Sequence, residues 1–188
     1  MNLKEYLEQQ REDYIKAVQM VFMKVSHPMS VVKESFLECL ETENISIPNE
    51  KEIFDFFRFD VLCKGSDGYF YDIKVNVNPD FEMKAFKELD IEIVMKSFVW
   101  NACEFSFTLP SFDPNSLSAW FKYWIKPNKQ ELSKNIQETV HSISFEKKEE
   151  EVKVFLDFGT VHSEGIIELI NLLCQEGVKK LFVQSMYE

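Results

Sequence analysis

The residue types best suited to catalysis lie together in one short segment, residues 157–164, with the sequence DFGTVHSE. His162 could act as a general base, Asp157 could orient its ring, and Ser163 could be a nucleophile, which are the roles of a hydrolytic triad. A predicted strand precedes the segment and a predicted helix follows it, and loops in such places often carry function. Each residue also has a structural explanation, with Ser163 as a helix cap and Asp157 as an outward-facing strand residue. No nucleophile-elbow motif accompanies the serine.

Other catalytic and binding motifs are missing from the sequence. The five glycines form neither a dinucleotide-binding fingerprint nor a phosphate-binding loop. The three histidines and four cysteines (Cys39, Cys63, Cys103 and Cys174) stand apart, without the spacing of zinc ligands. No calcium-binding loop occurs. We therefore expect no metal and no cofactor, and we interpret the cysteines as reduced, buried thiols.

The charge of the chain excludes one large class of partner. Its 188 residues include 32 Asp and Glu against 21 Lys and Arg, which gives a net charge of -11. A surface of this sign repels a phosphate backbone. Arginine, the usual contact to phosphate and guanine, occurs only at Arg11 and Arg58. We expect no nucleic-acid binding, and the acidity suits either a basic protein partner or solubility alone.

The sequence also predicts the compartment. The first residues, MNLKEYLE, carry charges where a signal peptide would be apolar. No apolar run approaches the ~20 residues that would span a bilayer. We therefore expect a cytoplasmic protein that does not contact a membrane. The pattern leaves the oligomeric state open.

The elements that must position the candidate residues follow from hydrophobic periodicity. Apolar residues recur every three or four positions over residues 3–25, which predicts a long amphipathic helix. A second helix is predicted after Ser30 and ends near Asn44. Further along, the period changes to two, which is typical of strands. We predict a single domain over residues 1–188, with a helical segment at 1–48 and a sheet-containing body at 54–188.

Within the body, strands and helices alternate. A charged loop at residues 146–151 is predicted to join two strands, Asp113 and Pro114 are predicted to begin a helix, and Gly177 is predicted to end another. The predicted strands cover residues 57–64, 69–77, 89–98, 103–109, 140–145, 152–158 and 178–184.

These elements define an α+β fold. From Cys103 onward the order is strand, helix, strand, strand, helix, strand, which resembles the βαββαβ order of ferredoxin-like folds. The alternative is one continuous, mostly antiparallel sheet with helices packed on one face.

Several aromatic residues have two interpretations. Trp120, Trp124, Phe112 and Tyr123 could line an aromatic pocket or belong to the core. Trp100 is predicted to lie at a hairpin tip, where it could anchor an interface.

The candidate partner-binding residues are acidic side chains on predicted turns and strands, together with this tryptophan. They are Glu149, Glu150, Glu151, Asp72, Asp90, Glu92 and Trp100. Carboxylates can steer a basic partner, and a few aromatic anchors can then be buried in the interface. We expect a non-enzymatic interaction protein, of the immunity or inhibitor type, that binds a basic partner such as a toxin. The alternative functions are a small hydrolase or small-molecule-binding enzyme that uses the 157–164 loop, and a subunit that dimerises through the helix at 3–25.

Overall fold

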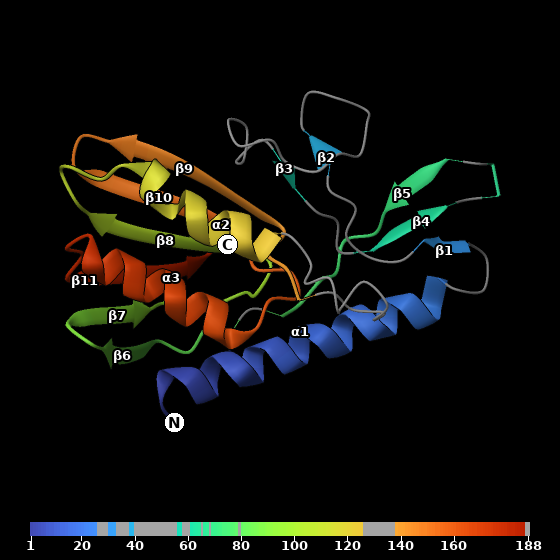
Figure 1. Cartoon of the computed structure of the whole chain (residues 1–188). Coiled ribbons are helices and arrows are strands. Elements are labelled where there is room, and N and C mark those ends of the chain that lie inside the picture. Colours follow the sequence, from blue (N-terminus) through green and yellow to red (C-terminus); the bar gives the residue numbers. More distant parts are fainter. Residues whose placement is uncertain are drawn as a thin grey trace.

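A six-stranded mixed sheet with helices on one face forms the main body of the protein (Figure 1). The computed structural model describes residues 1–25, 30–32, 38–39, 56–57, 61–64, 66–67, 69–78, 80–125 and 138–186. The strands of this sheet are β6 (Lys84–Glu88), β7 (Ile91–Met95), β8 (Cys103–Thr108), β9 (Ser142–Lys148), β10 (Glu151–Asp157) and β11 (Lys180–Ser185). Their order is β6-β7-β11-β8-β10-β9, with β7 and β11 parallel and the other neighbours antiparallel. The predicted α+β class is confirmed.

The long N-terminal helix is confirmed as α1 (Leu3–Val25). The side chain of Asn2 accepts a hydrogen bond from the backbone N–H of Glu5 (2.9 Å), and the Glu5 carboxylate accepts one from the N–H of Asn2 (3.0 Å). This reciprocal capping box fixes the start of the helix. The apolar face of α1 is buried at Leu3, Tyr6, Leu7, Tyr14 and Val18.

The other helices share one face of the sheet (Figure 1). A 3-10 turn (Pro114–Leu117) leads into α2 (Ser118–Ile125), and the side chain of Asp113 caps this turn by accepting from the N–H of Asn115 at 3.0 Å. Helix α3 (Ser163–Gln175) connects β10 to β11 and contacts both α1 and α2. Gly177 follows α3 with φ +103°, so the predicted left-handed helix end is confirmed.

Two small sheets lie outside the main body. β1 (Ser30–Val32), β4 (Leu62–Lys64) and β5 (Phe70–Asp72) form one of them. β2 (Glu38–Cys39) and β3 (Phe56–Phe57) form the other.

The helix predicted to begin after Ser30 is wrong where the structure describes it, because Ser30–Val32 and Glu38–Cys39 are strands. The β-branched pair Val31 and Val32 suits a strand, and both residues pair with β4. The other residues of that prediction lie outside the described ranges.

The loop predicted at 146–151 is also shorter than expected. β9 continues to Lys148 and β10 begins at Glu151, so only Glu149 and Glu150 turn the chain. The charged residues extend the strands because they lie on exposed positions of the β9–β10 hairpin, where the ladder needs no apolar side chain.

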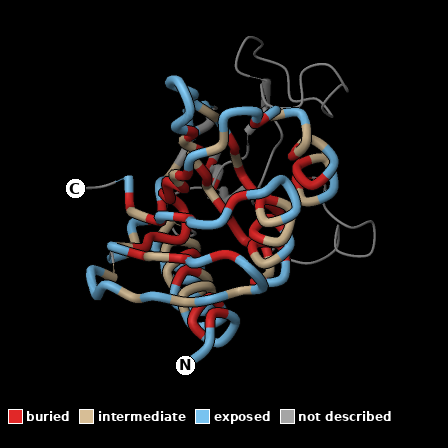
Figure 2. Tube along the Cα trace, turned by 90° about the vertical axis from the view of Figure 1, so that its left-hand side faces the viewer, coloured by how far each residue is buried: buried red, intermediate tan, exposed pale blue. Residues whose placement is uncertain are grey.

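The core lies between the sheet and the helices. Alternate residues of β10 are buried, namely Val152, Val154 and Leu156, as the period of a strand requires. Figure 2 looks onto the end of the sheet where the β6–β7 and β9–β10 hairpins turn, and the turns are exposed while the buried residues lie inside.

Candidate functional site

The loop between β10 and α3 is held by hydrogen bonds to its backbone carbonyls. The indole N–H of Trp100 donates to the carbonyl of Gly159 at 2.7 Å. Arg11 of α1 donates to the carbonyls of Val161 (2.8 Å) and Thr160 (3.1 Å). Three successive carbonyls of this loop are therefore held in place, two by Arg11 of α1 and one by the buried Trp100.

Gly159 is required by this arrangement. Its φ is +52°, and a Cβ placed on it would lie 2.1 Å from Cδ2 of the buried His141 ring. Any side chain here would therefore have both a strained backbone and a direct clash.

The three predicted catalytic residues contact other groups. Asp157 accepts a hydrogen bond from the N–H of Gly159 (2.8 Å) and lies 3.7 Å from Nδ1 of His141. The imidazole Nε2 of His162 lies 2.6 Å from a carboxylate oxygen of Glu138. The Ser163 hydroxyl is buried and donates to Glu164 at 3.3 Å. Nδ1 of His162 also lies 3.9 Å from the Glu164 carboxylate, so Glu164 contacts both His162 and Ser163.

A surface hollow of about 300 Å³ opens beside His162. Its lining includes Arg11, which lies 3.8 Å from Glu138, and Glu164, which pairs with Lys4 at 2.8 Å. The hydrogen bond from Lys4 lowers the pKa of Glu164. In such an arrangement the histidine could transfer a proton to or from a ligand, and the arginine could bind a negative charge on that ligand. Sequence reasoning missed Arg11 and Glu138, because both are far from the loop in sequence.

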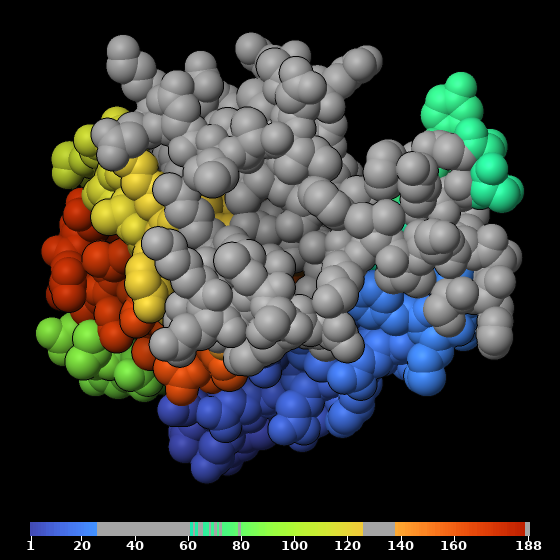
Figure 3. All heavy atoms as spheres, turned by 45° about the vertical axis from the view of Figure 1, so that its right-hand side comes forward, coloured from blue at the N-terminus to red at the C-terminus, as the bar shows by residue number. Residues whose placement is uncertain are grey.

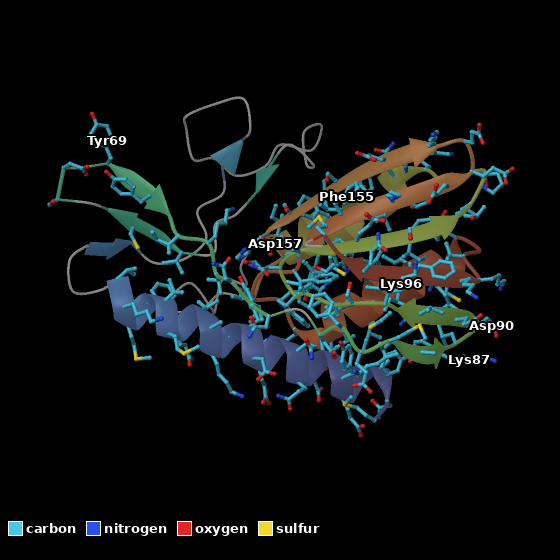
Figure 4. All side chains as sticks on the ribbon, turned by 180° about the vertical axis from the view of Figure 1, so that it is seen from behind. Tyr69, Lys87, Asp90, Lys96, Phe155 and Asp157 are labelled. Atoms are coloured by element: carbon cyan, nitrogen blue, oxygen red, sulfur yellow. The ribbon has the colours of Figure 1, made fainter. Side chains whose placement is uncertain are left out.

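The acidic candidates lie mainly at one end of the main sheet. The β6–β7 hairpin carries Asp90 and Glu92 there, and the β9–β10 hairpin carries Glu149, Glu150 and Glu151; all are exposed. Figure 4 shows Asp90 at the tip of its hairpin and Asp157 toward the opposite end. Lys180 of β11 lies between the hairpins and pairs with Glu92 at 3.5 Å. The structure therefore brings these acidic residues to one end of the sheet, on hairpins at its two opposite edges, with Lys180 of β11 between them.

The remaining two partner-binding candidates lie elsewhere. Asp72 belongs to β5 in the separate three-stranded sheet, and its side chain is outside the described part of the structure. The prediction that Trp100 lies at an exposed hairpin tip is wrong, because only 1% of it is accessible. Its ring packs between Phe98 (6.1 Å) and Phe158 (5.7 Å), and its indole N–H needs the Gly159 carbonyl as a buried acceptor.

Both hairpin tips have an unusual backbone that the sequence did not reveal. Leu89 has φ +48° and Glu149 has φ +56°, although neither is glycine. Leu89 is also 62% exposed, next to Asp90. Each is the first residue of a two-residue hairpin turn, and such turns adopt positive φ angles to match the twist of their strands, usually with glycine or asparagine. We name Leu89, Asp90, Glu149, Glu150 and Glu151 the hairpin surface.

The cysteines show no sign of metal or redox chemistry among the described residues. Cys63 and Cys103 are buried, and burial raises the pKa of both thiols. No group of three His, Cys, Asp or Glu side chains in the described ranges could hold a metal ion. None of the helices in the described part of the chain is long and apolar enough to cross a membrane.

Comparisons with known proteins give no family. The chain matches no protein-family model, and no curated protein and no solved structure matches it.

Proposed function

We propose that the protein is a cytoplasmic, non-enzymatic interaction protein of the immunity or inhibitor type, which binds a basic partner through the hairpin surface. The observation that carries this proposal is that two exposed hairpin turns with acidic side chains lie at the same end of the sheet, on either side of β11 and β8. Leu89 provides an exposed apolar anchor, the role that the sequence assigned to Trp100. The net charge of -11 adds long-range attraction for a cationic partner.

Charge reversal at the β9–β10 tip tests the proposal. The triple change Glu149→Lys, Glu150→Lys, Glu151→Lys should abolish retention of a basic protein from lysate of the source organism at low salt. The wild type should retain that protein at low salt and lose much of it at high salt, because charge steering is screened. The measurement is a tagged pull-down with quantitative mass spectrometry.

The triple change Glu8→Lys, Glu12→Lys, Asp13→Lys is the matched control, because it makes the same change in net charge at exposed acidic residues on α1, away from the hairpins. It should leave retention unchanged. If no protein is retained at either salt concentration, or if the control and the triple variant lose retention equally, the hairpin surface is not the binding site.

The finer fold assignment is also our proposal. We infer that β8, α2, β9, β10, α3 and β11 form a ferredoxin-like unit, to which β6 and β7 are added at one edge. The strand order β11-β8-β10-β9 supports it, with antiparallel neighbours and two helices on one face. An experimental structure of the full-length protein would test it.

A second candidate function is a small hydrolase or small-molecule-binding enzyme at the 157–164 loop. The observation that favours it is the close pair of His162 and Glu138 beside Arg11, at the edge of the 300 Å³ hollow. The buried hydroxyl of Ser163 argues against a serine nucleophile. His162→Ala should abolish any hydrolytic activity found in an ester and phosphoester screen while the circular-dichroism spectrum is preserved. Activity that survives this change excludes His162 as its base.

A further inference from the structure

A groove of about 410 Å³ runs between α2 and α3, away from the hairpin surface. Figure 3 shows α2 in yellow and α3 in orange-red next to each other at the surface. Aromatic rings from α2 and polar side chains from α3 line the groove, chiefly Trp120, Tyr123, Trp124, Glu168 and Asn171. We propose that this groove binds an arginine side chain of the basic partner, an inference that rests on the proposed function.

The aromatic wall of the groove has the geometry of a cation-binding corner. The rings of Tyr123 and Trp124 meet edge to face, with centroids 5.0 Å apart and planes at 87°. Tyr123 is 70% exposed, so its ring faces solvent instead of filling the core. A cation above such ring faces is attracted by their negative quadrupole.

The polar wall supplies acceptors for the same cation. Glu168 is exposed and accepts a hydrogen bond from the indole N–H of Trp124 at 2.9 Å, which holds the carboxylate beside the aromatic corner. A carboxylate can accept further hydrogen bonds through its remaining lone pairs. Asn171 of α3 adds a polar amide to this wall of the groove.

Arginine fits this set better than lysine does. Its planar guanidinium stacks on aromatic rings and presents five N–H donors in a fixed fork. One guanidinium can therefore cover an aromatic face and pair with Glu168 at the same time. An ammonium group is a strongly hydrated point charge without the stacking plane.

The test is a titration of the full-length, ¹⁵N-labelled protein with N-acetyl-argininamide, followed by NMR. The chain has three tryptophans, so three indole N–H signals act as reporters. We expect the Trp124 signal to shift with a millimolar dissociation constant and the signal of buried Trp100 to stay in place. N-acetyl-citrullinamide, the neutral isostere, should bind much more weakly.

Two substitutions assign the site. Tyr123→Ala should weaken binding about two- to fivefold, as the loss of a cation–π contact does at an exposed site. Glu168→Gln should weaken it at least as much, because it removes the charge and keeps an acceptor for the Trp124 indole. Tyr69→Ala is the matched control, because Tyr69 has the same 70% exposure but lies just before β5, outside the groove. Equal binding of the citrulline probe, or unchanged affinity in both groove variants, would overturn the proposal.

The experiments can disprove the groove proposal and the proposed function independently of each other. If the partner pull-down depends on the hairpin surface but is unaffected by Tyr123→Ala and Glu168→Gln, the groove proposal is wrong and the proposed function stands. If the probe binds the groove with the expected selectivity and no basic protein is retained, the proposed function is wrong and the groove remains an arginine site.

Discussion

At the scale of single residues, a cluster around Asp80 joins α1 to β6. The Tyr6 hydroxyl donates to the Asp80 carboxylate at 3.0 Å, and the Lys84 ammonium lies 3.0 Å from the same oxygen and 5.2 Å from the centre of the Tyr6 ring. Burial opposes ionisation of Asp80, but hydrogen bonds from Glu82 N–H, Lys84 and Tyr6 outweigh it and lower the pKa of Asp80. Burial, with the hydrogen bond to Asp80, raises the pKa of Tyr6.

The lowered pKa of Asp80 predicts how the free energy of unfolding depends on pH under acidic conditions. A depressed carboxyl pKa stabilises the fold at pH values above the unfolded value of 3.8, and the stabilisation is lost as the pH falls through the lower folded pKa. Asp80→Asn should therefore cost about 1–2 kcal/mol at pH 7, and the difference from wild type should shrink below about pH 4. Urea unfolding at several pH values measures it.

Glu82→Gln is the control for Asp80→Asn. Glu82 pairs with the same lysine, Lys84, at 2.6 Å, but its side chain is 79% exposed. An exposed ion pair contributes little, so this change should leave stability nearly unchanged. A loss as large as that of Asp80→Asn would contradict the assignment to the partly buried contact with Tyr6.

At the scale of elements, Gly165 sets how closely α2 approaches α3. The indole N–H of Trp120 donates to the Gly165 carbonyl at 2.8 Å. A Cβ on Gly165 would lie 2.8 Å from Cγ2 of Val161 and 3.1 Å from Cε2 of Trp124. The glycine therefore makes room for the indole that forms one wall of the aromatic groove.

Gly165→Ala should destabilise the protein although alanine is the better helix former. Alanine gains up to about 1 kcal/mol in helix propensity, whereas overpacking of this contact costs about 1–3 kcal/mol. We expect a net loss of stability in urea, together with a shift of the Trp124 indole N–H signal. Gly177→Ala is the control: strain at φ +103° should cost stability, but its nearest contact, Leu109, is 4.0 Å away, so the Trp124 signal should not move. Increased stability of Gly165→Ala would contradict the packing role.

The hydrophobic spacing of the sequence predicted those helices and strands whose buried residues recur with the period of the element. α1 has the bounds that its apolar spacing indicated, and Gly177 ends α3 as its conformational freedom suggested. β6 was missed because Lys84–Glu88 is an edge strand with no fully buried residue, so its pattern is weak. The strand at Ser30–Val32 depends on its partner β4, which no local pattern reveals.

The candidate site was predicted less well, because its contacts are long-range. The hydrogen bond from Arg11 to Val161 spans 150 residues, so residue types near the loop could not identify it. Trp100 was expected outside because it follows a strand near a turn, but its burial depends on the position of Phe158 and Gly159. Of the two acidic hairpins only the turn near residues 146–151 was predicted, whereas Asp90 and Glu92 were expected on a strand at 89–98, and only the strand order places both hairpins at one end of the sheet.

At the scale of the whole molecule, one charge imbalance acts on both stability and binding. The 32 acidic residues outnumber the 21 basic ones, and like charges repel one another most when the chain is compact. Many ion pairs, such as Lys4 with Glu164 and Lys180 with Glu92, are about half exposed and offset little of this repulsion. The acidity that would attract a basic partner therefore also weakens the isolated fold.

Salt should consequently stabilise the free protein, although it would weaken capture of the proposed basic partner. Between about 10 and 150 mM NaCl the screening length falls from roughly 30 to 8 Å, so repulsion across the surface decreases. We expect the melting temperature to rise by about 2–4 °C, which corresponds to about 1 kcal/mol for a chain of this size. The triple hairpin variant, whose net charge is nearer zero, should show a smaller rise. Differential scanning calorimetry measures the melting temperatures of the wild type and of the triple variant. A melting temperature that falls with salt would show that the ion pairs stabilise the fold more than the charge repulsion destabilises it.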